Sequence, residues 1–161
     1  MDASLEVVVS DGFAFAHGGD TAVLVYKAPA RLQRIRWTFD RIEELAARKA
    51  PINGLLIVLE SSDLPDAASR AENTRRMVEL RGRLRRVVTV VLGDSMRVSL
   101  VRTVMRAMFL LQGMSRVQHI VSSVDEGLQT LLSEPTTEMP TRAQLEATLT
   151  EIARRLECSF D

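Results

Sequence analysis

The chain has 161 residues and one cysteine, and its 21 lysine and arginine side chains are balanced by 21 aspartates and glutamates. This length suits a single domain with a core of its own, and the balanced charge gives no overall pull toward nucleic acid or anionic lipid. The lone Cys158 excludes an intramolecular disulfide and a cysteine-based zinc cluster, and no apolar run approaches the roughly 18–20 residues of a membrane span. The first residues also lack a basic stretch followed by an apolar run, so we expect a cytoplasmic protein.

The N-terminal part of the chain is expected to form three antiparallel strands. Apolar β-like runs cover residues 5–10, 13–17 and 21–28, and turn signals rich in glycine and aspartate separate them. After Pro29 the apolar period becomes helical, and this helix should end near Pro51. Its apolar stripe consists of Leu32, Ile35, Phe39, Ile42 and Ala46.

From Ile52 onward, buried strands alternate with helices. Residues 52–62 and 85–95 are apolar runs that end in polar residues, which is typical of strands buried on both faces. Helical patterns cover 66–84 and 97–113, a short strand is expected at 116–122, and Ser123 can cap the helix after it. The order β-β-β-α-β-α-β-α-β-α predicts an α/β fold of two or three layers, with a mostly parallel sheet and an antiparallel edge hairpin.

The last part of the chain predicts a linker and an amphipathic helix. Thr141 and Gln144 have the spacing of a capping box, and Leu145, Leu149 and Ile152 fall on one apolar stripe. We expect residues 1–134 to form the α/β domain, and residues 135–161 to be a linker and helix that belong to it.

The order of elements and three segments resemble the STAS family, which is named for sulfate transporters and anti-sigma-factor antagonists and includes the SpoIIAA-like proteins. The segments are TAVLVYKAP with the hairpin before it, GLLIVLESS, and RVQHIVSSVDEGLQTLL; Gly93, Asp94 and Ser95, directly after a strand, also resemble the SpoIIAA-like branch. The resemblance covers about residues 5–133. It implies a STAS/SpoIIAA-like fold with an extra C-terminal helix, and a bacterial regulatory role through a protein partner such as a kinase or an anti-sigma-like regulator.

The same resemblance implies a phosphorylation switch. Glu60 matches the family's strand-end acid and Ser69 its phosphorylated serine, whereas Ala68 and Ala71 stand where the family has aspartate and glycine. Ser61 and Ser62, at the carboxyl end of the strand, are alternative positions for a phosphate. Such a phosphate adds roughly −1.5 to −2 charge, which an acidic partner surface repels and which Arg70 could pair with. The other interpretation is that Ser61, Ser62 and Asp63 are ordinary turn and cap residues.

Sequence motifs for catalysis and for metal or cofactor binding are missing. His17 and His119 have no ligand-like spacing to other histidines, cysteines or acidic pairs, so we expect no metal. No glycine-rich phosphate loop, Gly-x-Ser-x-Gly elbow or Cys-His pair occurs, so we expect neither a cofactor nor an enzyme. Open α/β sheets bind ligands beyond the carboxyl ends of their strands, which points to the loops at 60–63 and 93–95.

Two helices carry features that suggest a binding surface. At 100° per residue, Trp37 falls roughly opposite the apolar stripe of its helix, which predicts that it faces outward as a contact for a partner or under a terminal segment. Helix 97–113 is apolar over well over half its circumference, more than one sheet face needs. We expect either the C-terminal helix or a second subunit to cover the excess, and a homodimer could form through either helix.

The arginines between positions 70 and 86 could form a nucleic-acid patch. However, Glu72 and Glu79 interrupt them and no aromatic residues lie between them, so a solvated helix face is the preferred interpretation and no nucleic-acid partner is expected.

The sequence thus favours a non-catalytic STAS-like interaction module. We expect it to bind a protein partner through the loop and helix after Glu60, with Asp63, Arg70 and Trp37 as contacts. The alternative is a carrier of a small apolar or lipid-like ligand, which the apolar excess on helix 97–113 also favours.

Overall fold

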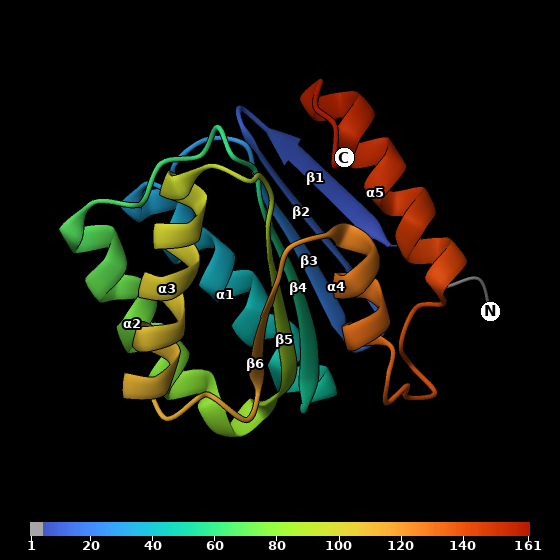
Figure 1. Ribbon diagram of the computed structural model, residues 1–161. Helices are drawn as coiled ribbons and strands as arrows, with labels where there is room; N and C mark the ends of the chain where they lie inside the picture. The colour runs from blue at the N-terminus through green and yellow to red at the C-terminus, as the bar shows by residue number, and fades with distance from the viewer. Residues whose placement is uncertain (1–4) are drawn as a thin grey trace.

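The computed structural model describes residues 5–161, which form one six-stranded sheet in the order β1-β2-β3-β4-β5-β6 (Figure 1). Strands β1 (Glu6–Ser10), β2 (Phe13–Gly18) and β3 (Thr21–Tyr26) form an antiparallel meander. Strands β4 (Ile52–Val58), β5 (Leu84–Val91) and β6 (Gln118–Val121) continue from β3 in parallel. The predicted α/β fold with an antiparallel edge is confirmed.

The helices cover both faces of the sheet, so the domain has three layers (Figure 1). Helices α1 (Leu32–Lys49), α2 (Ala67–Leu80) and α3 (Met96–Leu111) lie on one face, and a 3₁₀ turn (Arg81–Arg83) follows α2. Their placement follows from the strand order, because crossovers of one hand between successive parallel neighbours put every connecting helix on the same side. Helices α4 (Val124–Leu131) and α5 (Arg142–Leu156) lie on the other face.

Each face of the sheet has its own hydrophobic core. On the α4–α5 side, strand residues such as Val23, Leu55 and Val90 pack with Leu145 and Ile152 of α5. On the α1–α3 side, Phe13 and Phe15 of β2 pack with residues of α1, α2 and the neighbouring strands. Met114, after α3, belongs to the same core. Each core matches the alternation of side chains along the strands.

Helix α5 packs on β1 and β2, which corrects one expectation from the sequence. We expected that this helix could cover the apolar excess of helix 97–113, but α5 and α3 lie on opposite faces of the sheet (Figure 1). The physical reason is that α4, with eight residues, leaves the face of β1 and β2 bare, and the apolar stripe of α5 completes it. The predicted capping box of Thr141 and Gln144 is present.

The position of Trp37 also differs from the prediction. Its ring is half-buried and meets Phe13 and Phe15 edge-on, with ring centroids 6.0 and 5.6 Å apart. The helical wheel considers only the main apolar stripe of α1 and therefore places Trp37 outside. In the fold, β2 also lies beneath the flank of α1, and its phenylalanines contact Trp37. Trp37 is therefore part of the packing between α1 and β2.

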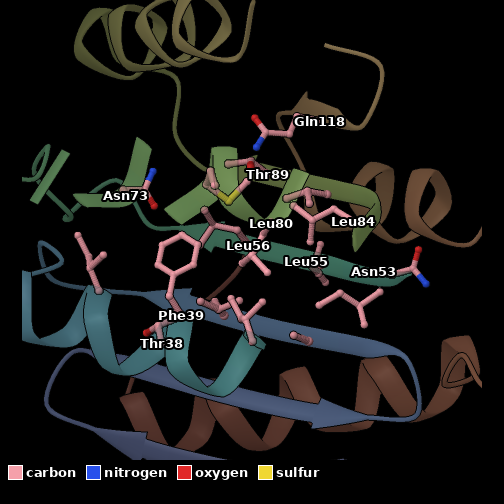
Figure 2. Close-up of a pocket in the computed structure, with 18 of the residues that line it drawn as sticks. Thr38, Phe39, Asn53, Leu55, Leu56, Asn73, Leu80, Leu84, Thr89 and Gln118 are labelled. Carbon is pink, nitrogen blue, oxygen red and sulfur yellow. The ribbon is translucent and has the colours of Figure 1, made fainter. Parts of the chain in front are cut away.

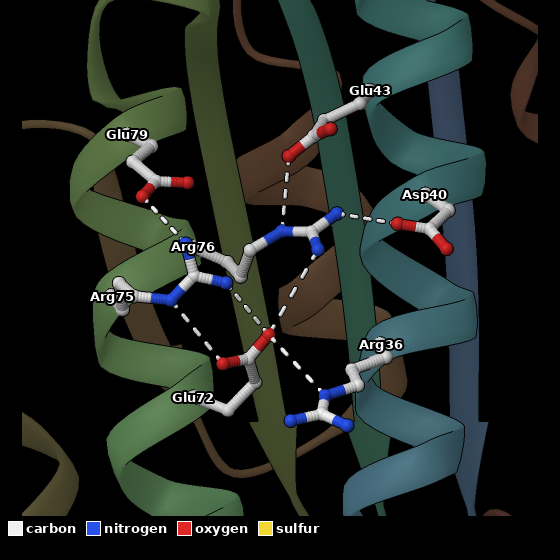
Figure 3. Close-up of polar contacts among 7 residues, drawn as sticks. All are labelled: Arg36, Asp40, Glu43, Glu72, Arg75, Arg76 and Glu79. Carbon is white, nitrogen blue, oxygen red and sulfur yellow. Dashed lines mark hydrogen bonds and ion pairs between the residues drawn. The ribbon is translucent and has the colours of Figure 1, made fainter.

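Several ion pairs join α2 to α1 (Figure 3). Only Ser69 and Leu80 of α2 are buried, whereas Arg76 reaches Asp40 at 2.7 Å and Glu43 at 3.0 Å. Glu72 links Arg75 and Arg36 on the same surface. Arg36, Arg75 and Arg76 are therefore engaged with acidic neighbours.

Candidate functional site

The loops after β4 and β5, to which the sequence pointed, meet at the carboxyl edge of the sheet. Gly93 has φ +108°, and a Cβ there would lie 2.7 Å from Cδ of Glu60, so the two loops touch. Asp63 forms an ion pair with Arg97 in the first turn of α3. Ser95 caps α3 by accepting a hydrogen bond from the Val98 amide at 3.3 Å. The loop after Glu60 and the start of α3 therefore form one continuous surface.

Two arginines near this edge bond to backbone carbonyls. Arg102 of α3 donates to the carbonyl oxygens of Val91 at 2.6 Å and Gly93 at 2.9 Å, which ties α3 to the end of β5. Arg70 donates to the Pro65 carbonyl, and Asp94 is exposed. Trp37 packs over β2, away from the pairs that join the two loops.

The three serines considered for phosphorylation differ in accessibility. Ser69 is fully buried in the first turn of α2, where its amide donates to the Asp66 carboxylate at 2.8 Å. That hydrogen bond holds the pKa of Asp66 below its usual value. Ser62 is half-buried, whereas Ser61 is exposed and donates to the Lys27 carbonyl at 3.0 Å. A kinase could reach Ser61 without unfolding the domain.

The outer face of α3 is an exposed apolar surface. Met96, Leu100, Leu110 and Leu111 are 89, 61, 69 and 87% exposed, and Leu64 in the neighbouring loop is 43% exposed. The only fully buried residue of α3 is Val98. Large apolar side chains gathered on one helix are unusual for a surface without a binding role.

The arginines of α3 border this apolar surface. At 100° per residue, Arg97 and Arg106 fall on opposite flanks of the exposed stripe, and both are exposed. No aspartate or glutamate occurs between Asp94 and Asp125. The surface therefore combines an apolar centre with Arg106 on one flank and the Arg97–Asp63 ion pair on the other, which favours a partner with an acidic group near Arg106.

A cavity of about 120 Å³ lies between the sheet and helices α1–α3 (Figure 2). Aliphatic, aromatic and methionine side chains form most of its wall, with Phe39 from α1, Met77 from α2 and Met105 from α3. Burial raises the pKa of Tyr26 in this wall, so its phenol stays neutral. All three helices of this layer thus contribute to the cavity wall.

Four residues that line the cavity have buried polar side-chain atoms without a hydrogen-bond partner in the described residues, namely Thr38, Asn53, Thr89 and Gln118. Thr89 of β5 and Gln118 of β6 are 1% and 6% exposed, and Oγ1 of Thr89 and Oε1 of Gln118 make no hydrogen bond within the described residues. Leaving such a group unpaired costs about 1–3 kcal/mol. The sequence analysis missed both residues, although a threonine and a glutamine inside apolar strand runs were a signal.

The histidines lie apart from this surface. Burial and Arg86 hold the pKa of His119 below its usual value, and His17 lies 3.4 Å from Glu6 on β1. Among residues 5–161, no cluster of three histidine, cysteine or acidic side chains could hold a metal ion. No helix in that range is both long and apolar enough to span a membrane.

Comparison with known proteins identifies the fold. Neither a known sequence family nor a curated protein matches the chain. Among solved structures, it is similar to an uncharacterised DUF3478-family protein with a SpoIIAA-like fold from Shewanella loihica PV-4, at 12% identity and a TM-score of 0.55. That match covers 79% of this chain and 91% of the other.

Two further structures are more distant. The MdcD–MdcE hetero-dimer of Pseudomonas malonate decarboxylase matches at 12% identity and a TM-score of 0.47, over 97% of this chain and 90% of the other. The unphosphorylated anti-sigma factor antagonist SpoIIAA matches at 13% identity and a TM-score of 0.37, over 82% and 99%. Both TM-scores lie below 0.5, so neither likeness supports a statement about this chain.

The architecture defines a three-layer α/β domain whose sheet is parallel except at one edge. More particularly, it is similar to the SpoIIAA-like fold of the Shewanella protein, as the sequence resemblance implied.

Proposed function

We propose that this chain is a non-catalytic regulatory module that binds a protein partner through the outer face of α3 and the loop after β4. The observation that carries the proposal is the exposed apolar side chains of α3, with Leu110 and Leu111 at 69 and 87% exposure. Burying one such leucine contributes about 1.5–3 kcal/mol, so a few of them supply the centre of an interface.

The chemistry of the surface favours a partner of complementary charge. An apolar patch with an acidic border complements the leucines of α3 and Arg106 on one flank, whereas Arg97 on the other flank already pairs with Asp63. A second copy of this chain is a weaker candidate, because the arginines of two such helices would face each other. The stripe of α5, the other predicted dimer surface, is buried against the sheet.

Two exchanges test this surface. Leu100→Glu and Leu111→Glu are expected to raise the Kd for the partner at least tenfold, because each places a charge in the apolar centre of the interface. Ala147→Glu, on the exposed face of α5, is the matched control and should leave the Kd unchanged. Calorimetry with the purified partner measures the affinities, and equal Kd values for all three variants would contradict the proposal.

Sedimentation of the chain alone distinguishes a second copy from a different protein. We expect a monomer at micromolar concentration. A dimer that dissociates in Leu111→Glu would show that α3 binds another copy instead.

We further propose that phosphorylation of Ser61 regulates this binding. Ser61 lies in a shallow surface cleft whose charged residues are Lys27, Arg155, Asp11 and Glu157, and the two cations could pair with a phosphate. The loop that carries Ser61 continues to Asp63, which pairs with α3, so the added negative charge would lie in the loop that we assign to partner binding. Phosphopeptide mapping of protein isolated from its source should find phosphate on Ser61. Phosphate on Ser69 alone would contradict this placement, since Ser69 is buried.

A second function, the carrier of a small apolar ligand, is favoured by the cavity beneath α1–α3. Its volume of about 120 Å³ is close to that of a cavity that holds one benzene molecule, roughly 150 Å³, and is too small for a long acyl chain. Mass spectrometry under native conditions should then find a small molecule released from the purified protein, and a ligand-free chain would argue against the carrier.

A further inference from the structure

The cavity wall places two unpaired polar groups on the same face of neighbouring strands. Gln118 is the register partner of Val87, and Thr89 follows Val87 by two residues, so both side chains face the layer of α1–α3 (Figure 2). Thr89 can donate and accept a hydrogen bond, and the Gln118 amide oxygen accepts one. Together they match a ligand group that both donates and accepts, such as a hydroxyl.

The rest of the wall excludes a charged ligand. No lysine, arginine, histidine, aspartate or glutamate lines the cavity in the described part of the chain. An ion placed there would lose its hydration without a counter-charge, which is far more costly than burying a neutral polar group. The size of the space limits the ligand to about one six-membered ring.

We propose that this cavity binds a neutral, hydroxyl-bearing compound of about the size of phenol, and that Thr89 and Gln118 recognise its hydroxyl. The ligand hydroxyl donates to Oε1 of Gln118 and accepts from the hydroxyl of Thr89, while the ring packs between Phe39 and the methionines of α2 and α3. This inference rests on the carrier function and does not depend on partner binding by the outer face of α3.

Helix α3 provides the route of entry. It contributes Met105 and Phe109 to the cavity wall but buries only Val98 completely, and α2 beside it is held to α1 by ion pairs at the surface. The packing that would have to be disrupted to admit a ligand is therefore smaller here than on the α4–α5 face.

The methionine methyl groups allow a direct test with the full chain. Met77 and Met105 line the cavity, whereas Met96 is 89% exposed and serves as an internal control. Methyl-labelled protein is titrated with phenol, with toluene as a neutral ligand of similar shape without the hydroxyl, and with benzoate as a charged one. Phenol is expected to shift the resonances of Met77 and Met105, to leave Met96 unchanged, and to bind about tenfold more tightly than toluene.

Two conservative variants test whether Thr89 and Gln118 recognise the hydroxyl of the ligand. Thr89→Val and Gln118→Leu keep the volume of each side chain and are each expected to weaken phenol binding about fivefold, with toluene binding unchanged. Both should fold at least as stably as the unmodified chain, because each removes a buried group without a partner. Circular dichroism confirms the fold before titration.

The outcomes separate this inference from the carrier function. Equal binding of phenol and toluene, or a preference for phenol that survives both substitutions, would leave the carrier standing and overturn recognition by Thr89 and Gln118. Tighter binding of benzoate than of phenol would overturn the choice of a neutral ligand. If neither phenol nor toluene shifts Met77 or Met105 up to its solubility limit, both the carrier and this inference fail.

Discussion

Replacing Leu145 with alanine is expected to lower the free energy of unfolding by about 2–5 kcal/mol. Leu145 lies in the first turn of α5 and is completely buried in the core between α5 and the sheet. Shortening it removes apolar contacts and leaves a cavity that the rigid strands beneath cannot fill. The size of the loss tests our proposal that residues 135–161 belong to the same folding unit as the rest of the domain.

The same substitution at Leu111 is the matched control. Leu111 is 87% exposed, so Leu111→Ala should change the free energy of unfolding by no more than about 0.5 kcal/mol. Urea denaturation followed by circular dichroism measures both variants. Small and equal changes, or a separate early transition for α5, would show that α5 is not part of the cooperative core.

Gly19→Ala is expected to lower the free energy of unfolding by about 2–4 kcal/mol. Gly19 has φ +56°, in the left-handed region that side chains disfavour, and a Cβ there would lie 1.6 Å from the carbonyl oxygen of Glu138. The linker that leads to α5 would have to move away from the β2–β3 turn, although Thr136 and Asp20 hold it there through a 2.6 Å hydrogen bond.

Gly82→Ala is the control for this exchange. Gly82 lies in the 3₁₀ turn after α2, and a Cβ there would meet nothing within 4 Å. Thermal unfolding of the two variants should show a clear fall in Tm for Gly19→Ala and little change for Gly82→Ala. Similar Tm values for both would contradict the close approach of the linker to the turn.

The architecture could be predicted from the sequence because local signals agreed with one another. The buried strand at 52–58 is a continuous apolar run, and the helix after it begins after Asp66, within the helical pattern predicted for residues 66–84. Ser123 and Thr141 cap the helices that they were expected to cap. Each of these features depends on residues a few positions apart, which a sequence displays directly.

The candidate site was only partly predictable, because it depends on which distant elements meet. The loops around Glu60 and Gly93 come together because parallel strands end at one edge, which a general rule anticipates. The position of Trp37 over Phe13 and Phe15, and of α5 on β1 and β2, depends on the width of the sheet beneath them. The burial of Ser69 and the cavity beside Thr89 arise from packing among helices, which a pattern of single residues does not contain.

Site-specific photo-crosslinking tests the central claim, that the outer face of α3 binds a protein partner, most directly. A photoreactive side chain at position 111 of α3 is compared with one at position 147 of α5, both exposed but on opposite faces of the sheet. Illumination in cells of the source organism should give a defined protein adduct from position 111 and none from position 147. An adduct from position 147 alone, or none from either under conditions where the chain is abundant, would contradict the account.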